Sequence, residues 1–385
     1  MRVMIACGEP SGDLYAGALA SELRTRQPDI EVFGMGGERL RAAGAHLVAH
    51  YHGISVTGLT EALSVVPRSL RLLRTLTETA RRRRPDVFVA VDFPDFNFRL
   101  MARMAGLGIP VVYYISPQLW AWRAGRMATM RKHVSKVLVI FPFEQAIYGR
   151  AGVPVEFVGH PLVEMARAAV AGHDRAAFLG RLGLAPAAPT VALLPGSRRN
   201  ELARHVPVLA DSLALMAAAQ PGVQFVVARA PHMPDDALAP VLRAAGACQR
   251  PLAIVADGTD DVLAFSDVAV TASGTATVQC AIHERPMVVI YKLSALTYAL
   301  GKPLAMVDMY AMPNLVAGAR IVPELIQDAC TAPAVAAETV ALLADPVRHG
   351  HMRQALGAVR DQLHVAGASG RAAEAVLRAA GTTPS

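Results

Sequence analysis

The chain has 385 residues, of which 53% are hydrophobic and 18% are charged, and its formal net charge is +7. This composition excludes an intrinsically disordered chain, and the length favours two domains over a single core. The positive charge favours an anionic partner, such as a nucleic acid, an acidic lipid or a phosphorylated substrate, and does not decide among them.

The first residues, "MRVMIACGEPSGD", predict a buried strand, because their apolar run is too short for a signal peptide. The longest uncharged stretch, residues 104–122, contains two glycines and two prolines and therefore makes a poor membrane span. The four cysteines lie far apart without metal-ligand spacing, which favours a reducing compartment. We therefore expect a cytoplasmic protein that can still touch a membrane surface.

Short apolar runs predict a series of strands in each half of the chain. They cover residues 3–7, 87–91, 111–115, 137–141 and 155–159, and then residues 191–195, 223–228, 252–256, 268–272 and 287–291. Runs that are apolar throughout are typical of parallel strands covered on both faces, and the helical stretches between them supply the crossovers. The expected fold is α/β, with two doubly wound, Rossmann-like domains facing across a cleft and ligands at the carboxyl ends of the strands.

A stretch that becomes rich in glycine and proline, residues 172–189, is expected to link the two domains. The predicted N-terminal domain covers residues 1–171 and the predicted C-terminal domain covers residues 186–345. The helical residues 346–381 are expected to pack back on the N-terminal domain.

Two glycine-containing loops come first in the chain. In "CGEPSGD" (7–13) a substrate contact by Ser11 and simple helix capping by Asp13 are both open. The segment "FGMGGERL" (33–40) is only a weak dinucleotide fingerprint, because it lacks the full glycine spacing and does not follow the first strand. NAD is therefore rejected as the leading ligand.

Residues 56–84 predict an amphipathic helix with arginines beside its apolar stripe and four arginines at its end. Such a helix can lie on an anionic bilayer or receive an amphiphilic ligand. The alternative is an ordinary core helix with a solvated basic face, which is the commoner case for this pattern. A nucleic acid is not favoured, because no nucleic-acid-binding module accompanies the arginines and only 5% of the residues are aromatic.

Polar side chains follow the next strands. "VFVAVDFPDFN" ends a buried strand in Asp92, where a general base would be needed, whereas helix capping is a simple alternative for Asp95. "SPQLWAWRAGR" (116–126) holds both tryptophans, which are expected to line a pocket or a domain interface. His160 ends a later strand, and both a substrate contact and a satisfied core histidine remain open for it.

In the second half, "LLPGSRRNEL" (193–202) predicts a strand that stops at a glycine and opens a helix beside two arginines. Backbone N–H groups at a helix N-terminus attract anions, and the arginines add positive charge. "TASGTATVQC" (271–280) is a second turn of this kind, and Gln279 falls where it could bond ribose hydroxyls. Two such turns in one half favour a diphosphate and its neighbouring sugar; ordinary helix capping is the alternative.

Nine sequence blocks occur in the order and spacing of the lipid-A-disaccharide synthases, from about residue 3 to about residue 328. They are "GEPSGD", "DVFVAVDFPDFN", "SPQLWAWR", "FPFE", "FVGHPL", "LLPGSRRNE", "SGTATVQ", "PMVVIYK" and "PNLVAGARIVPELIQ". Any one block is weak, whereas nine in order are highly specific. The chain therefore resembles this family, with a weaker match in its helical tail.

The resemblance implies an inverting glycosyltransferase of the two-domain GT-B type. Its substrates would be UDP-2,3-diacylglucosamine and 2,3-diacylglucosamine 1-phosphate (lipid X), and its products the β(1→6) lipid A disaccharide 1-phosphate and UDP. It further implies a peripheral protein on the cytoplasmic face of the inner membrane of Gram-negative bacteria, without a catalytic metal or cofactor. The oligomeric state is left open, with a homodimer as one option.

The resemblance also implies roles for single residues, with Asp92 as the catalytic base. The donor UDP would be bound by Gly196, Ser197, Arg198, Ser273, Gly274, Thr275, Thr277, Gln279 and Asn314. The acceptor or its acyl chains would be bound by Ser11, Glu61, Asp95, Asn97, Trp120, Trp122, Arg123 and His160. Three positions depart from the family pattern: Gln279 stands for an expected glutamate, Pro10 for an alanine, and Arg320 comes one place late.

Two other function classes are weighed against this one. Another GT-B enzyme that uses a UDP-sugar, such as an epimerase, shares the fold and the UDP loops but lacks the "WAWR" and "DFPDFN" blocks. A non-catalytic sensor of UDP-sugars or lipids would keep the Arg198 loop and would not require Asp92.

Overall fold

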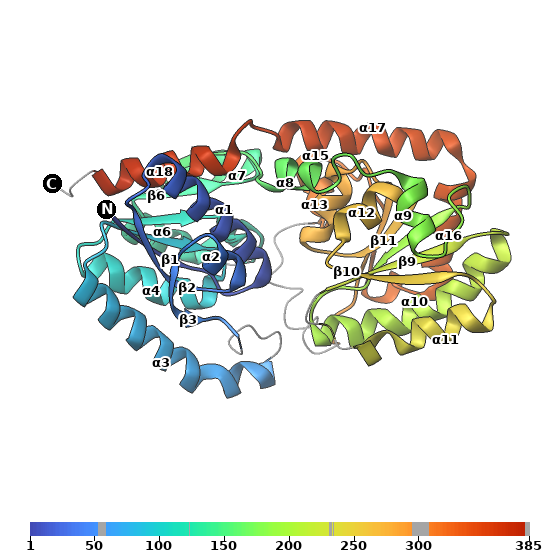
Figure 1. Ribbon diagram of the computed structural model, residues 1–385, viewed down its shortest axis with the longest axis horizontal. Helices are drawn as coiled ribbons and strands as arrows, with labels where there is room; N and C mark the ends of the chain where they lie inside the picture. The colour runs from blue at the N-terminus through green and yellow to red at the C-terminus, as the bar shows by residue number, and fades with distance from the viewer. Residues whose placement is uncertain (53–58, 123, 231–232, 234, 295–307, 382–385) are drawn as a thin grey trace. The chain divides into compact units, whose positions relative to one another are not determined.

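The computed structural model describes the chain except for residues 53–58, 123, 231–232, 234, 295–307 and 382–385, and the side chains of 59–65, 121–122, 124 and 235 are likewise left undescribed (Figure 1). The described chain forms two compact units. Unit 1 contains Met1–Pro161 and the C-terminal residues from Leu363, and unit 2 contains most of the residues from Leu162 to Gln362.

Unit 1 is built on a seven-stranded parallel sheet in the order β3-β2-β1-β4-β5-β6-β7. The strands are β1 (Arg2–Ala6), β2 (Glu31–Gly36), β3 (His46–His50), β4 (Val87–Val91), β5 (Val111–Tyr114), β6 (Lys136–Val139) and β7 (Val155–Phe157). The helices are α1 (Pro10–Arg26), α2 (Glu38–Ala42), α3 (Leu59–Arg83), α4 (Pro94–Gly106), α5 (Leu119–Trp122), α6 (Met127–His133), α7 (Pro142–Arg150) and α18 (Ala368–Gly381).

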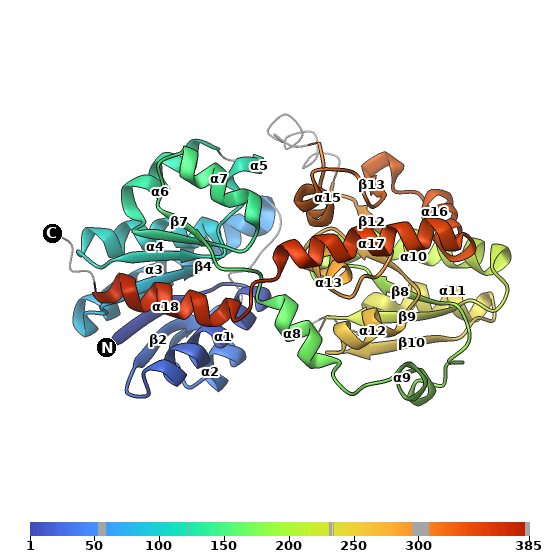
Figure 2. The same cartoon turned by 90° about the horizontal axis from the view of Figure 1, so that it is seen from above.

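Helices cover both faces of this sheet, as its uniformly apolar strands require. On one face, side chains of α3, α4 and α6 pack with Phe33, Phe88 and Tyr113 in a continuous core. On the other face α18, drawn in red, lies beside α1 and contacts β4 and β5 (Figures 1 and 2). The order of the strands reverses between β1 and β4, which makes this the switch point of the sheet.

Unit 2 is built on a six-stranded parallel sheet in the order β10-β9-β8-β11-β12-β13. The strands are β8 (Thr190–Leu194), β9 (Gln224–Arg229), β10 (Leu252–Ala256), β11 (Val268–Ala272), β12 (Met287–Tyr291) and β13 (Glu324–Ile326). The helices include α8 (Leu162–Ala169), α9 (Arg175–Arg181), α10 (Arg199–Ala219), α11 (Ala239–Ala247), α12 (Thr259–Phe265), α13 (Thr275–Ile282), α15 (Met312–Ala317), α16 (Ala332–Ala344) and α17 (Pro346–Leu363). Its switch point lies between β8 and β11.

Helix α10 is the one helix among the described residues that is long and apolar enough to span a membrane. It packs against α11 and α16, and its residues Leu202, Leu209 and Leu213 are buried in the core of unit 2. Its apolar face is therefore used inside the unit, as expected of a core helix in an α/β fold.

The two doubly wound sheets confirm the predicted fold class, and all ten predicted strands are present within two residues of their predicted ends. Three further strands, β2, β3 and β13, were not predicted. Glycines interrupt the pattern of β2, where a Cβ on Gly34 would lie 1.9 Å from the Ile5 carbonyl oxygen. β3 is a half-buried edge strand and β13 has only three residues, so neither carries a clear apolar run.

Residues 172–189, expected to be a linker, form an ordered part of unit 2 that contains α9. The Arg175 guanidinium donates to the Ala188 carbonyl at 3.0 Å and pairs with Asp267 at 2.9 Å. Glycine and proline mark turns in a sequence, but the contact of Arg175 with Asp267, which is far away in the chain, fixes the segment. Of the two C-terminal helices, α18 belongs to unit 1 and α17 to unit 2.

The glycine-rich segment 33–40 is used for packing. The buried Asp13 carboxylate accepts hydrogen bonds from the backbone N–H groups of Gly37 (2.7 Å), Arg39 (2.9 Å) and Leu40 (3.2 Å). A Cβ on Gly37 would lie 2.7 Å from an oxygen of Asp13, so the glycine makes this approach possible. The motif thus joins α1 to the first turn of α2.

Candidate active site

The carboxyl ends of β1 and β4 meet at the switch point of unit 1, where parallel sheets bind ligands. The loop after β1 begins with Cys7 and Gly8, and the loop after β4 begins with Asp92 and Phe93. The Phe93 ring packs so closely on Gly8 that a Cβ there would lie 2.1 Å from it. The "GEPSGD" and "DFPDFN" motifs therefore form one contiguous surface.

Asp92 is held in an unusual backbone conformation. Its φ is 46° and that of Phe93 is 49°, a region that residues other than glycine rarely adopt. The Asp92 carbonyl accepts hydrogen bonds from Asn97 Nδ2 and from the Tyr113 hydroxyl, both at 2.8 Å, and its N–H donates to the Tyr114 carbonyl at 3.2 Å. The surrounding structure thus fixes the backbone, while the side chain is half-buried at the edge of the sheet.

Asn97 and Asp95 have different surroundings. Asn97 is fully buried, and its Nδ2 also lies 3.2 Å from the Ala6 carbonyl and 3.3 Å from that of Val91. It therefore ties the ends of β1 and β4 together and positions Asp92. Asp95 is exposed and pairs with Arg126 at 3.1 Å.

The other residues predicted to bind the acceptor differ in their burial. Ser11 is half-buried in the first turn of α1. His160 is buried, and burial lowers the pKa of its imidazole to about 3, so the ring is neutral. It packs edge to face against Phe141, with 5.3 Å between the ring centres. The side chains of Glu61 and Trp122, and the whole of Arg123, lie outside the described residues.

Glu144, in the "FPFE" block, was not predicted as a site residue. Its side chain is 1% exposed, and Oε1 accepts a hydrogen bond from Trp120 Nε1 at 3.1 Å. Burial raises the pKa of the carboxyl group to about 8, although contacts from Trp120, Ser116 and the Phe141 backbone favour the charged form. The available sequence signal was weaker than that for Asp92: Glu144 lies in the first turn of the helix that follows an apolar strand, whereas Asp92 follows its strand directly.

Replacing Glu144 with glutamine is expected to stabilise the protein above neutral pH. The native carboxyl group keeps its proton up to about pH 8, whereas the unfolded chain loses it near the ordinary value of 4.5. The contribution of Glu144 to the free energy of unfolding is therefore fully present below pH 4.5 and is lost as the pH rises towards 8, by at most ~1.4 kcal/mol per unit. The variant lacks this loss and is expected to be more stable by ~2 kcal/mol near pH 8.5.

Urea denaturation at about pH 5.5 and about pH 8.5 measures this difference. The matched control is Glu78→Gln on α3, where the carboxylate is exposed. Equal pH dependence in the wild type and in Glu144→Gln would contradict a protonated, buried Glu144.

In unit 2, the turn after β8 is closed by a residue that the sequence did not single out. Glu201 Oε2 accepts hydrogen bonds from the N–H groups of Ser197 (3.1 Å) and Arg198 (3.3 Å), and Glu201 Oε1 lies 3.3 Å from the Arg198 guanidinium. Gly196 has a φ of 112°, and a Cβ there would lie 2.6 Å from Glu201 Oε2. Two of the N–H groups that were predicted to bind an anion are thus bonded to Glu201. These bonds fix the loop and orient Arg198.

His205 also fixes the turn after β8. Its Nδ1 lies 2.8 Å from the Pro195 carbonyl oxygen, and its Nε2 accepts from the Lys292 N–H at 3.0 Å. The proton is therefore assigned to Nδ1, and burial lowers the pKa of the ring even though the bond to Pro195 acts to raise it. His205 joins the carboxyl ends of β8 and β12.

The second predicted anion site, the turn after β11, opens α13. Gly274 has a φ of 146°, and Thr275 is exposed at the start of the helix. The Ser273 hydroxyl donates to the Tyr310 carbonyl at 2.9 Å, and the buried Thr277 hydroxyl donates to the Gly274 carbonyl at 2.7 Å. These two hydroxyls therefore shape the turn.

Gln279 and Asn314 are engaged with protein groups. Gln279 Nε2 donates to Asp260 Oδ1 at 3.2 Å, on one side of α13. Asn314 is fully buried, its Nδ2 donates to Val322 O (3.0 Å) and Glu324 Oε1 (2.8 Å), and its Oδ1 accepts from two backbone N–H groups. The Asn314 amide therefore organises the segment between α15 and β13. Arg320 in that segment is exposed and donates to the Asp308 carbonyl at 2.8 Å.

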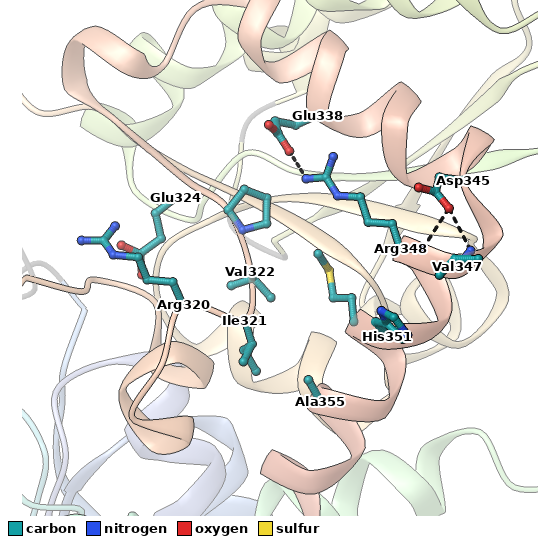
Figure 3. A pocket seen from close by; sticks show the side chains of 12 residues that line it. Arg320, Ile321, Val322, Glu324, Glu338, Asp345, Val347, Arg348, His351 and Ala355 are labelled. Carbon is teal, nitrogen blue, oxygen red and sulfur yellow. Dashed lines mark hydrogen bonds and ion pairs between the residues drawn. The ribbon is translucent and has the colours of Figure 1, made fainter.

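A pocket of about 790 Å³ lies between this segment, α16 and α17 (Figure 3). Its charged groups largely satisfy one another, since Arg348 pairs with Glu338 and Asp345 caps the backbone N–H groups of Val347 and Arg348. None of the predicted donor residues lines it. Among the described residues, no group of three or more histidine, cysteine or acidic side chains could hold a metal ion.

A family model described as lipid-A-disaccharide synthetase matches residues 3–378. The chain belongs to the lipid-A-disaccharide synthetase family. It is 42% identical over 377 residues to the lipid-A-disaccharide synthase of Myxococcus xanthus, covering 98% of this chain and 97% of the relative. It is 41% identical over 381 residues to that of Geobacter sulfurreducens, covering 99% and 97%.

Solved structures agree with the fold of this lipid-A-disaccharide synthetase family member. The UDP-GlcNAc 2-epimerase from Neisseria meningitidis, bound to UDP-GlcNAc, aligns with a TM-score of 0.71 at 12% identity over 98% of this chain and 100% of its own. The glycotransferase of kitacinnamycin aligns with a TM-score of 0.62 at 19% identity over 98% of each chain. At these identities the likeness shows the fold, which is of the GT-B kind. Family membership makes the chain a glycosyltransferase that forms the lipid A disaccharide.

Proposed function

We propose that the chain transfers 2,3-diacylglucosamine from its UDP form to the 6-hydroxyl of 2,3-diacylglucosamine 1-phosphate (lipid X), giving the β(1→6) disaccharide 1-phosphate and UDP. One observation of the site carries the proposal. This chain, a member of the family, has the Asp92 carboxylate at the switch point of unit 1, on a backbone fixed by Asn97 and Tyr113. A fixed carboxylate at the carboxyl end of a strand is suited to accept a proton from a bound hydroxyl.

The reaction is a single displacement at the anomeric carbon. The Asp92 carboxylate takes the proton of the acceptor 6-hydroxyl while that oxygen attacks C1 of the donor sugar. The new C–O bond forms as the bond from C1 to the diphosphate oxygen breaks, so the configuration inverts and UDP departs with the electron pair. The proton stays on Asp92 until it passes to solvent.

The departing diphosphate gains negative charge, which positive groups must stabilise. Arg198 stands at the N-terminus of the 21-residue helix α10, with its side chain 39% exposed. The helix dipole and the guanidinium favour an anion at the same place. The turn at Ser273–Gly274–Thr275 opens a second helix towards the same edge of the sheet.

The acyl chains require an apolar surface, and an anionic membrane surface attracts positive charge. Helix α3 provides both. Val66 and Leu70 are 41% and 48% exposed, whereas Leu73 and Leu76 are buried in the core. Arginines are exposed along the same stretch of the helix, at 68, 71 and 74. This arrangement supports a peripheral position on the cytoplasmic face of the inner membrane, where anionic lipids attract basic helices.

Mass spectrometry of the purified protein with UDP-2,3-diacylglucosamine and lipid X, in detergent with EDTA, tests the proposal. We expect the disaccharide 1-phosphate and UDP to appear together, and EDTA to leave the rate unchanged. Intact substrates alongside normal UDP binding would instead favour a non-catalytic binder. Conversion of the UDP-sugar without an acceptor would favour an epimerase.

A further inference from the structure

The segment after β5 is fastened to helix α7. The Tyr148 hydroxyl donates to the Pro117 carbonyl at 2.9 Å, and Trp120 Nε1 donates to Glu144 Oε1 at 3.1 Å. The Trp120 ring also stands edge-on to Phe143, with 5.1 Å between the ring centres. All three anchors belong to α7, so residues 116–120 are attached to that helix at several points.

Glu144 is the unusual member of this group. Glu144 and Asp13 are the two buried carboxyl groups among the described residues, and Asp13 is satisfied by three backbone N–H groups. In contrast, Glu144 Oε2 makes no hydrogen bond of ordinary geometry, and neither does the buried Ser116 hydroxyl. A buried carboxylate in such a place is costly, whereas a neutral acid can keep the indole bond of Trp120 at lower cost.

This group lies beside the reactive carboxylate. The end of β5 is bonded directly to the Asp92 loop through the Tyr113 hydroxyl and the Tyr114 carbonyl. Among the described residues, two titratable groups interact electrostatically with Glu144: the charge of Asp92 adds to burial in raising the Glu144 pKa, and Glu144 adds to burial in raising the pKa of Tyr148 on α7. The segment 116–120 therefore leaves the sheet next to Asp92.

We propose that Glu144 is a positioning residue for the acceptor: through its bond to the indole it holds Trp120, and with it residues 116–120, in place beside Asp92. The inference rests on the proposed function for the identity of the acceptor. Ionisation of Glu144 would place a charge beside the Trp120 indole and leave Oε2 buried without a donor, which changes the surroundings of the ring.

Trp120 reports directly on this link. The chain has two tryptophans, so Trp122→Phe leaves Trp120 as the only one. In that background we expect the fluorescence emission of Trp120 to change with a midpoint near pH 8, the pKa of Glu144. Glu144→Gln keeps an acceptor for the indole but cannot ionise, and we expect it to abolish the transition. An unchanged transition in the Glu144→Gln protein, or none in the parent, would overturn the proposal.

Steady-state kinetics of single variants of the full chain test the effect on the acceptor. Glu144→Ala is expected to raise the acceptor KM about tenfold, with less change in kcat and an unchanged Kd for UDP. Glu144→Gln is expected to restore the acceptor KM to within about twofold at pH 7. An acceptor KM unaffected by Glu144→Ala, or a glutamine variant as impaired as the alanine one, would refute the role.

If Glu144→Ala does not fold, Trp120→Phe decides, because it removes the indole donor and keeps an aromatic ring against Phe143. A rise of about threefold in acceptor KM supports the proposal, and no rise overturns it. The fluorescence titration is independent of turnover. A transition in the Trp122→Phe protein, together with a wild-type protein that forms no disaccharide, would therefore reject the proposed function and keep the link between Glu144 and Trp120.

Discussion

Replacing Asp92 with asparagine is expected to lower kcat by about 10² to 10⁴-fold and to leave the affinity for UDP unchanged. The amide cannot accept the proton of the acceptor hydroxyl at neutral pH, so the main path of proton removal is lost. Asparagine is chosen because Asp92 has a φ of 46°, a region that asparagine tolerates better than most residues. The carbonyl bonds from Asn97 and Tyr113 involve the backbone and should persist.

Turnover by mass spectrometry and UDP binding by calorimetry measure the two effects separately. The matched control is Asp86→Asn, which removes an exposed carboxylate at the opposite end of the same strand, where Asp86 accepts from the Arg2 N–H. We expect this control to retain kcat within about twofold, because surface changes of this kind have small effects. An Asp92→Asn protein with wild-type kcat would show that another group, or water, takes the proton.

Replacing Arg198 with glutamine is expected to weaken UDP binding by about 10 to 100-fold and to lower kcat as well. A charge-assisted hydrogen bond contributes about 1.5 to 3 kcal/mol, and the same charge stabilises the diphosphate as it leaves. The loop backbone should keep its shape, because Glu201 bonds the N–H groups of Ser197 and Arg198. Calorimetric titration with UDP and with uridine distinguishes the contributions, since only UDP carries the diphosphate.

Two controls test whether the effect of Arg198→Gln on UDP binding is direct. Arg243→Gln removes an exposed arginine on α11 of the same unit, and should change the Kd for UDP by less than about twofold if the effect is local. Uridine should bind Arg198→Gln as it binds the wild type. Equal losses for UDP and uridine would show that Arg198 shapes the nucleoside site and does not contact the diphosphate.

Much of the fold follows from local sequence. Buried parallel strands are apolar throughout, so "VFVAV" and "VALLP" are recognisable without any tertiary information. Strands that depend on their neighbours are different. Strand β2 contains Gly34, which is needed there because only a residue without a Cβ fits against Ile5. From local sequence alone, that glycine predicts a break in the strand.

The candidate site shows the same division. The strand-end position of Asp92 and the turn at Gly196 and Ser197 follow from motif and spacing alone. The partners of these residues come from elsewhere in the chain: Tyr113 fixes Asp92 from the neighbouring strand, and His205 fixes the turn from within α10. A sequence lists the donors and acceptors that a residue carries, and the fold decides which of them meet.

The sequence by itself determined the two-unit α/β fold, the family, and the positions in the chain where chemistry is expected, because strand period and motif order are local properties. Only the tertiary structure decided that Glu201 bonds the N–H groups expected to await a ligand, that Asn314 is saturated by internal hydrogen bonds, and that Glu144 is buried against Trp120. Burial and hydrogen-bond satisfaction depend on residues far apart in the chain. Whether a polar residue contacts a ligand or supports the loop that does is therefore settled by folding.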